Sequence, residues 1–375
     1  AETFVLLKNE GNLLPLKKQG KIALIGPLAD TRNNIAGTWS VAQAPEKYTT
    51  IKEAMEKALD GKATLLYAQG SNIWRERELQ KNGELGKSIA WGDEVKMKNE
   101  ALQIAKEADV IICAMGETAD MSGECASRTN LEMPDVQQEL LAELAKTGKP
   151  VVLLNFAGRP TVLSWENEHI PAIMNVWFGG SEVGDALCDV IFGDKVPSGK
   201  LTTSMPKTTG QEPLYYNHQN TGRPVPDDNQ KFAKFASNCM DVSNGPLYPF
   251  GYGLSYTTFE YGDLKLSSHQ VNMDDWKITA TINVKNTGSR DADEVVQLYI
   301  RDMVVSISRP VKELKGFQRI HLAAGESREI SFDITPEMLK FYNAELKHVI
   351  EPGDFQIMVG GNSKEVKTQN LTVKN

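Results

Sequence analysis

The chain is poor in cysteine and carries no excess of positive charge. Its 375 residues include four cysteines, and the net charge is −8 with a pI near 5.4. An acidic chain does not attract nucleic acid or an anionic membrane surface, so neither is expected as a partner. No apolar stretch reaches the roughly 20 residues of a membrane-spanning helix, and no signal peptide is recognisable. Because the natural amino terminus is expected to lie outside this sequence, the missing signal peptide says little about export.

The sequence also lacks the motifs of metal and nucleotide sites. Cys113, Cys125, Cys188 and Cys239 show neither metal-ligand spacing nor a disulfide framework. We expect Cys113 and Cys188 to be buried core thiols, whereas a bridge between Cys125 and Cys239 stays open. No Gly-x-Gly-x-x-Gly fingerprint is present. No metal and no cofactor is therefore expected.

The first 200 residues alternate between short apolar runs and segments of helical periodicity. The runs predicted to be strands are Lys21–Gly26, Thr64–Ala68, Asp109–Ala114, Pro150–Asn155 and Ala172–Trp177. The predicted helices lie near 50–60, 94–107, 134–147 and 181–192, the last with Ser181 as its cap. This alternation predicts an α/β sandwich for residues 1–205, with a mainly parallel sheet between two layers of helices.

The pattern changes twice in the second half of the chain. Residues 206–258 are rich in Pro, Asn, Gly and Tyr without periodicity, and are predicted to be a connector that packs across a surface or lines a site. Residues 259–375 contain short runs of alternating apolar and polar residues separated by turns. This pattern predicts an all-β sandwich of the immunoglobulin or fibronectin type III kind.

The loop after the third predicted strand contains a candidate catalytic acid. Ligands bind beyond the carboxyl ends of strands in parallel sheets, and Glu117, Glu124 and Arg128 all follow the run that ends at Ala114. A carboxyl group there can donate a proton, and an arginine can hold a carboxylate or bind sugar hydroxyls. The alternative is an ordinary solvated acidic loop.

The chain resembles glycoside hydrolase family 3 in the carboxyl-terminal part of its bacterial β-glucosidases of three-domain build. The matching phrases are Val5-Leu6-Leu7-Lys8-Asn9 with Leu13-Leu14-Pro15-Leu16, Ile25-Gly26-Pro27-Leu28-Ala29-Asp30, Gly37-Thr38-Trp39-Ser40, the Glu124 loop, Pro197-Ser198-Gly199-Lys200-Leu201, Tyr248-Pro249-Phe250-Gly251-Tyr252-Gly253-Leu254-Ser255-Tyr256 and Ser308-Arg309-Pro310-Val311-Lys312-Glu313-Leu314-Lys315-Gly316-Phe317. They follow the order of the family and span nearly the whole chain. The resemblance implies the same two folds, with a fibronectin type III-like domain at the end.

The resemblance also implies a function. The phrase Glu-x-x-Ser-Arg starts at Glu124 and implies that this residue is the general acid/base of a retaining, exo-acting β-glucosidase, with Glu117 as the second choice. The nucleophilic aspartate of such enzymes lies in an amino-terminal (β/α)8 barrel that this sequence does not contain, so the chain alone is expected to be inactive. Asp274-Asp275-Trp276 resembles the nucleophile phrase only by coincidence. A β-xylosidase of the same family and a non-catalytic carbohydrate-binding fragment are the alternatives.

Several further residues are candidates for contact with a β-glucoside or oligosaccharide substrate. Trp39 suits an aromatic platform for a sugar ring, although a core tryptophan is as good an interpretation. Arg128 holds the loop, contacts the substrate or is an ordinary surface arginine. His218 and Arg223 lie in the connector, where they either border the site or dock onto a domain. The resemblance implies a periplasmic or secreted protein and leaves open whether it forms a homodimer.

Overall fold

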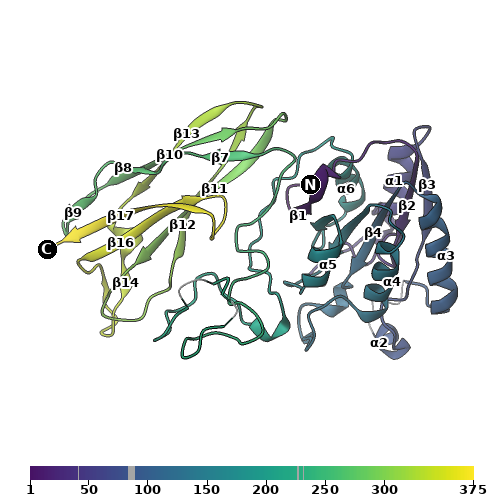
Figure 1. Cartoon of the computed structure of the whole chain (residues 1–375), viewed down its shortest axis with the longest axis horizontal. Helices are drawn as coiled ribbons and strands as arrows, with labels where there is room; N and C mark the ends of the chain where they lie inside the picture. The colour runs from purple at the N-terminus through teal and green to yellow at the C-terminus, as the bar shows by residue number, and fades with distance from the viewer. Residues whose placement is uncertain (41, 83–88, 226–227, 231) are drawn as a thin grey trace. The chain divides into compact units, whose positions relative to one another are not determined.

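The computed structural model describes residues 1–40, 42–82, 89–225, 228–230 and 232–375 (Figure 1). These residues form two compact units. The first contains Ala1–Gly199 and Pro206–Gly210, and the second contains Lys200–Met205 and Gln211–Asn375. The domain limits expected from the sequence, 1–205, 206–258 and 259–375, stay predictions.

A six-stranded sheet forms the centre of the first unit. Its strands are β1 (Val5–Asn9), β2 (Lys21–Ile25), β3 (Thr64–Ala68), β4 (Val110–Gly116), β5 (Val151–Phe156) and β6 (Ala172–Asn175). Their order is β1-β6-β5-β4-β2-β3, and all pairs are parallel except β1 with β6. Strand β5 is buried along its whole length, as expected for a strand covered on both faces. The predicted parallel sheet is thus confirmed.

Helices cover this sheet. They are α1 (Ile51–Leu59), α2 (Arg77–Asn82), α3 (Glu94–Glu107), α4 (Asp135–Ala145), α5 (Ser164–His169) and α6 (Val183–Ile191). Helix α1 packs beside α6, and α3 packs beside α4. Thr50 and Glu53 form a capping box at the start of α1, each side chain accepting a hydrogen bond from the other residue's backbone N–H. None of the described helices is long and apolar enough to cross a lipid bilayer.

Two local features differ from the sequence prediction. Helix α6 begins at Val183 with Glu182 at its N-cap and no capping side chain, so the prediction that Ser181 caps it is wrong. Strand β1 was not predicted, and it lies antiparallel at the edge of the sheet beside β6. Cys113 and Cys188 are both buried, as expected.

The strand order contains a topological switch point between β2 and β4. The chain passes from β2 to β3 on one side and returns to β4 on the other side of β2. At such a point the loops after the two neighbouring strands diverge and leave a crevice at the carboxyl edge of the sheet. The loop after β2 contains Trp39, and the loop after β4 contains Glu124. The fold thereby brings two predicted site residues to one edge.

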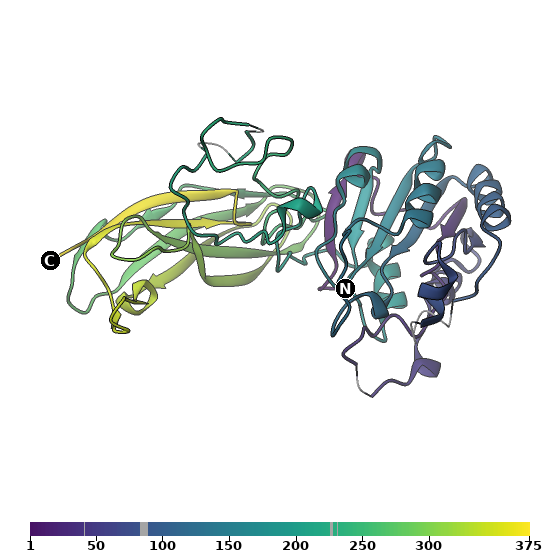
Figure 2. The ribbon, with the colours of Figure 1, turned by 90° about the horizontal axis from the view of Figure 1, so that it is seen from below.

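The second unit is a mainly antiparallel sandwich, in which β9 pairs with β17 in parallel. Its strands are β7 (Phe259–Tyr261), β8 (Lys265–Leu266), β9 (Gln270–Asn272), β10 (Ile278–Asn286), β11 (Ala292–Asp302), β12 (Glu313–Leu322), β13 (Ser327–Ile334), β14 (Phe341–Tyr342), β15 (His348–Val349), β16 (Gly353–Gly360) and β17 (Val366–Lys374), with the short helix α7 (Pro336–Leu339). One sheet has the order β13-β10-β7 with β8 paired to β10, and the other has the order β12-β11-β16-β17-β9. Figure 2 shows the long strands closely aligned. The predicted fibronectin type III-like sandwich is confirmed.

Segments before β7 contribute to the packing of this sandwich. The buried Glu294 of β11 accepts hydrogen bonds from Lys200 Nζ at 3.1 Å and from the Tyr261 hydroxyl at 2.9 Å. The buried Gln297 donates to the carbonyl of Gly251 at 3.1 Å. The ring of Tyr216 stacks on Phe250 at 4.2 Å, and its hydroxyl accepts a hydrogen bond from the backbone of β12. Residues of 200–258 therefore satisfy buried polar groups of the strands.

We predict that residues 259–375 alone are less stable than residues 200–375. Removing Lys200 leaves the Glu294 carboxylate buried without its cation, a change that costs about 3–5 kcal/mol. Urea unfolding followed by the fluorescence of Trp276, the only tryptophan in both fragments, measures the difference. Lys200→Met in the longer fragment isolates the ion pair. Equal unfolding midpoints for the two fragments would show that the preceding segment does not belong to the sandwich.

A second prediction concerns Glu166 of α5, which is buried at 2% exposure. Burial raises the pKa of Glu166 from its ordinary value of 4.5 to about 7, with a smaller contribution from the charge of Glu132. A carboxyl whose pKa is raised in the folded state adds stability below pH 4.5, and this contribution is lost as the pH rises through 7. Glu166→Gln cannot ionise, so the variant should be more stable than the natural protein above pH 7, by up to roughly 3 kcal/mol.

The measurement is the thermal midpoint of both proteins between pH 4.5 and 8, with Glu168→Gln as a control because Glu168 lies exposed on the same helix. If the thermal midpoints of the natural protein and Glu166→Gln depended on pH in the same way, the raised pKa of Glu166 would be contradicted.

Candidate active site

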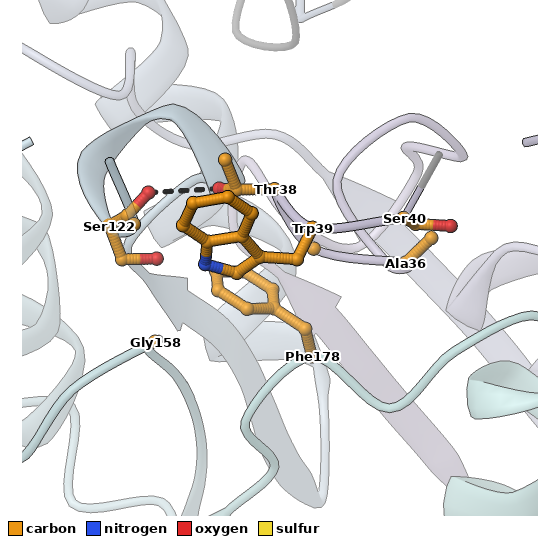
Figure 3. A pocket seen from close by; sticks show the side chains of 9 residues that line it. Ala36, Thr38, Trp39, Ser40, Ser122, Gly158 and Phe178 are labelled. Atoms are coloured by element: carbon orange, nitrogen blue, oxygen red, sulfur yellow. Dashed lines mark hydrogen bonds between the residues drawn. The ribbon is translucent and has the colours of Figure 1, made fainter. Parts of the chain in front are cut away.

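A cleft opens at the carboxyl edge of the parallel sheet. It has a volume of about 460 Å³, and its walls are Ala36, Gly37, Thr38, Trp39, Ser40, Ser122, Gly123, Gly158 and Phe178 (Figure 3). These residues come from the loops after β2, β4, β5 and β6. The cleft is therefore built at the switch point, where parallel sheets bind their ligands.

Two aromatic side chains form much of the apolar surface of the cleft. Trp39 is 70% exposed, so the interpretation of this residue as a core tryptophan is not what the structure shows. Phe178 is half-buried, and both rings face the cleft (Figure 3). A Cβ on Gly37 would lie 3.2–3.3 Å from Phe178, so the Trp39 loop packs closely against this ring. Exposed aromatic faces of this kind suit the apolar face of a sugar.

The buried carboxylate of Glu117 is the electrostatic centre of the loop after β4. Glu117 is 1% exposed and directly follows the strand. Its carboxylate accepts a hydrogen bond from Arg128 Nη1 at 2.7 Å and pairs with Arg159 Nε at 3.2 Å. The backbone N–H of Gly158 adds a longer bond of 3.4 Å. Two guanidinium groups therefore compensate the cost of burying this charge.

The same loop is held along its length by donors from neighbouring loops. The second guanidinium nitrogen of Arg159 donates to the carbonyl of Ala126 at 2.6 Å and also to that of Met121. The Thr38 hydroxyl contacts the carbonyl of Ser122 at 2.9 Å and that of Ala119. Because these donors bind backbone atoms, they fix the path of the chain on both sides of residues 123–125.

Glu124 lies at the apex of this anchored loop and is exposed. Its neighbours Gly123 and Cys125 have φ values of +96° and +57°, which is the left-handed region that a non-glycine residue rarely adopts. A Cβ on Gly123 would lie 3.2 Å from Trp39 Nε1, so the apex borders the aromatic wall of the cleft. The structure thus presents a carboxylate beside an aromatic cleft, and this carboxylate has no partner among the described residues.

Three other predicted site residues, Arg128, His218 and Arg223, are not among the residues that line the cleft. Arg128 uses its guanidinium on Glu117 and on the carbonyl of Glu132, and it lies 5.3 Å from the centre of the Trp74 ring. His218 and Arg223 belong to the second unit, where the backbone of His218 bonds to Val311 and that of Arg223 to Ser237. Contact of these three side chains with a substrate stays a prediction. Within the described ranges, no group of three or more His, Cys, Asp or Glu residues is arranged to hold a metal ion.

Arg159 and Phe178 were not predicted from the sequence as site residues. Both follow strands that were predicted correctly, Arg159 after β5 and Phe178 after β6. The rule that ligands bind at the carboxyl ends of parallel strands applies to every strand. Applied beyond β4, it would have identified both residues as candidates.

Comparison with known proteins gives a family for both units. The model of the "Glycosyl hydrolase family 3 C-terminal domain" matches residues 4–256, and that of the "Fibronectin type III-like domain" matches residues 294–363. The fold is also that of solved structures. A β-glucosidase from Listeria innocua in complex with isofagomine has a TM-score of 0.86 and 34% identity, over 99% of this chain and 48% of that one.

Curated relatives match over nearly the whole chain. A periplasmic β-glucosidase from Salmonella typhimurium is 45% identical over 369 residues, which is 98% of this chain and 48% of the relative. A β-xylosidase from Formosa agariphila is 37% identical over 100% of this chain and 49% of the relative. The chain spans about half the length of the curated relatives it matches. It belongs to glycoside hydrolase family 3.

Proposed function

We propose that the chain is the acid/base-bearing part of a retaining, exo-acting β-glucosidase that removes terminal non-reducing β-D-glucosyl residues. The observation that carries this proposal is the exposed Glu124 at the apex of a loop anchored by Arg159 and Thr38, beside a cleft with two aromatic rings. Membership in family 3 and the β-glucosidases among the relatives support it.

In this proposal Glu124 acts twice. Retaining hydrolysis needs two carboxyl groups about 5–5.5 Å apart. Protonated Glu124 gives its proton to the glycosidic oxygen while a nucleophilic carboxylate attacks the anomeric carbon, so the leaving group departs as an alcohol. Glu124 then takes a proton from water, which attacks the glycosyl-enzyme, releases glucose and frees the nucleophile.

The nucleophile is proposed to come from a (β/α)8 barrel domain outside residues 1–375. The barrel would therefore complete the pair of carboxyl groups that retaining hydrolysis needs. For residues 1–375 alone we expect no hydrolysis, since one carboxyl group gives no covalent route.

The contacts of the other charged residues suggest supporting roles. Glu117 is buried between Arg128 and Arg159, so its carboxylate oxygens bind groups of the protein itself. We propose that Glu117 and Arg128 hold the loop and that Trp39 contacts a sugar ring. His218 and Arg223 remain candidates for substrate contact.

A β-xylosidase is the second candidate, and the 37% identity with the Formosa agariphila β-xylosidase favours it. A carbohydrate-binding fragment without catalysis is the third. Because the first relative is named a periplasmic enzyme, we propose a periplasmic or secreted location. A homodimer stays a prediction that the mass of the purified protein tests.

We predict that Glu124→Gln in the full-length enzyme separates substrates by their leaving group. The amide keeps the size of the side chain but cannot donate the proton, so kcat/KM for cellobiose should fall by about 10²–10⁴-fold. An activated dinitrophenyl glucoside needs little protonation, and its kcat/KM should change little. Its turnover should show a burst of phenol followed by a slow phase, since deglycosylation lacks its base.

Glu117→Gln is the matched comparison in the same assay. This change removes the partner of two guanidinium groups, so it should lower the thermal midpoint and reduce kcat/KM for both substrates to a similar extent. If Glu117→Gln shows the separation by leaving group and Glu124→Gln does not, the two glutamates exchange roles.

A further inference from the structure

Arg159 bridges the two ends of the segment that carries Glu124. Its side chain is 19% exposed, and it follows β5 rather than the loop itself. One nitrogen binds the Glu117 carboxylate at 3.2 Å, and another donates to the carbonyl of Ala126 at 2.6 Å and to that of Met121. One side chain thus connects the base of the loop, its entry to the apex and its exit from the apex.

The Glu124 side chain depends on this backbone for its position. Within the described part of the chain, its carboxylate makes no hydrogen bond or ion pair. Its two neighbours have left-handed φ values, a conformation that the non-glycine Cys125 keeps only where the surroundings hold it. A free carboxylate on a tight apex points in a constant direction only if both ends of the apex are fixed.

We infer that Arg159 is the positioning residue for Glu124, an inference that rests on the proposed acid/base role of Glu124. Arg159 does not touch the reacting atoms. It holds the carbonyls of Met121 and Ala126, so that the carboxyl group reaches the glycosidic oxygen at hydrogen-bond distance when substrate is bound.

The spacing of the donors in an arginine side chain suits this task. The guanidinium group offers five N–H donors in a planar fork, so it can meet a carboxylate on one side and two carbonyls on another. A lysine in its place keeps the positive charge beside Glu117 but presents a single nitrogen. Arg159→Lys therefore separates the charge of the side chain from its geometry.

The test uses the full-length enzyme with Arg159→Lys, Arg159→Ala and Glu124→Gln, and with Arg75→Lys as the control. Arg75 is an arginine of the same unit that pairs with Glu94, Asp135 and Glu139 on the surface. For Arg159→Lys we expect kcat/KM for cellobiose to fall by about 10–100-fold, because a displacement of about 1 Å can cost that much. The kcat/KM for the dinitrophenyl glucoside should change by less than about threefold. Added guanidinium ion should partly restore kcat/KM for cellobiose in the Arg159→Ala variant.

The outcomes separate the two claims. The positioning role would be overturned if Arg159→Lys lowered kcat/KM equally for both substrates or did not lower it for cellobiose. It would also be overturned if guanidinium ion did not raise kcat/KM of Arg159→Ala. Each of these results leaves the acid/base role intact as long as Glu124→Gln still separates the substrates. If Glu124→Gln itself fails to separate them, the proposed acid/base function falls, and the inference about Arg159 falls with it. If Arg159→Ala folds poorly, the kcat/KM values of Arg159→Lys for the two substrates test the positioning role.

Discussion

The buried carboxylate of Glu117 determines the shape of the candidate active site. It is placed at the end of a fully buried strand segment, where an unpaired charge would cost several kcal/mol, and two arginines from different loops compensate it. One of them, Arg159, uses its remaining donors on the carbonyls around the apex. The arginine that neutralises the Glu117 carboxylate therefore also fixes the backbone of the loop. Within the described ranges Glu124 is unpaired and exposed, and the backbone on both sides of it is held.

The strand order explains why this loop meets an aromatic cleft. Strands β2 and β4 are neighbours in the sheet, although β3 separates them in the chain. Their following loops therefore diverge at one edge, one with Trp39 and the other with Glu124, and the residues after β5 and β6 close the remaining walls. A family that shares this sheet can vary the shape of the cleft by changing these loops without changing the buried strands.

The sequence predicted the fold well because its strands are short, continuous and apolar. The limits of β2, β3 and β4 lie within two residues of prediction, and the period of two in β10 and β11 predicted the sandwich. The edge strand β1 and the uncapped start of α6 were missed, since edge pairing and cap geometry depend on tertiary contacts. Glu117 and Glu124 look alike in the sequence. Only the structure shows that Arg159, 42 residues after Glu117, binds the Glu117 carboxylate. Glu124 has no partner in the part of the chain that the structure describes.

The central claim is that Glu124, and not Glu117, is the acid/base residue of the complete enzyme. The most direct measurement is the product formed by Glu124→Ala from an activated aryl glucoside in the presence of azide. Without a carboxylate to activate water, the glycosyl-enzyme should be captured by azide, which needs no base. We predict faster turnover and a β-glucosyl azide with this variant, and neither with Glu117→Ala. Formation of the azide by Glu117→Ala alone would contradict it.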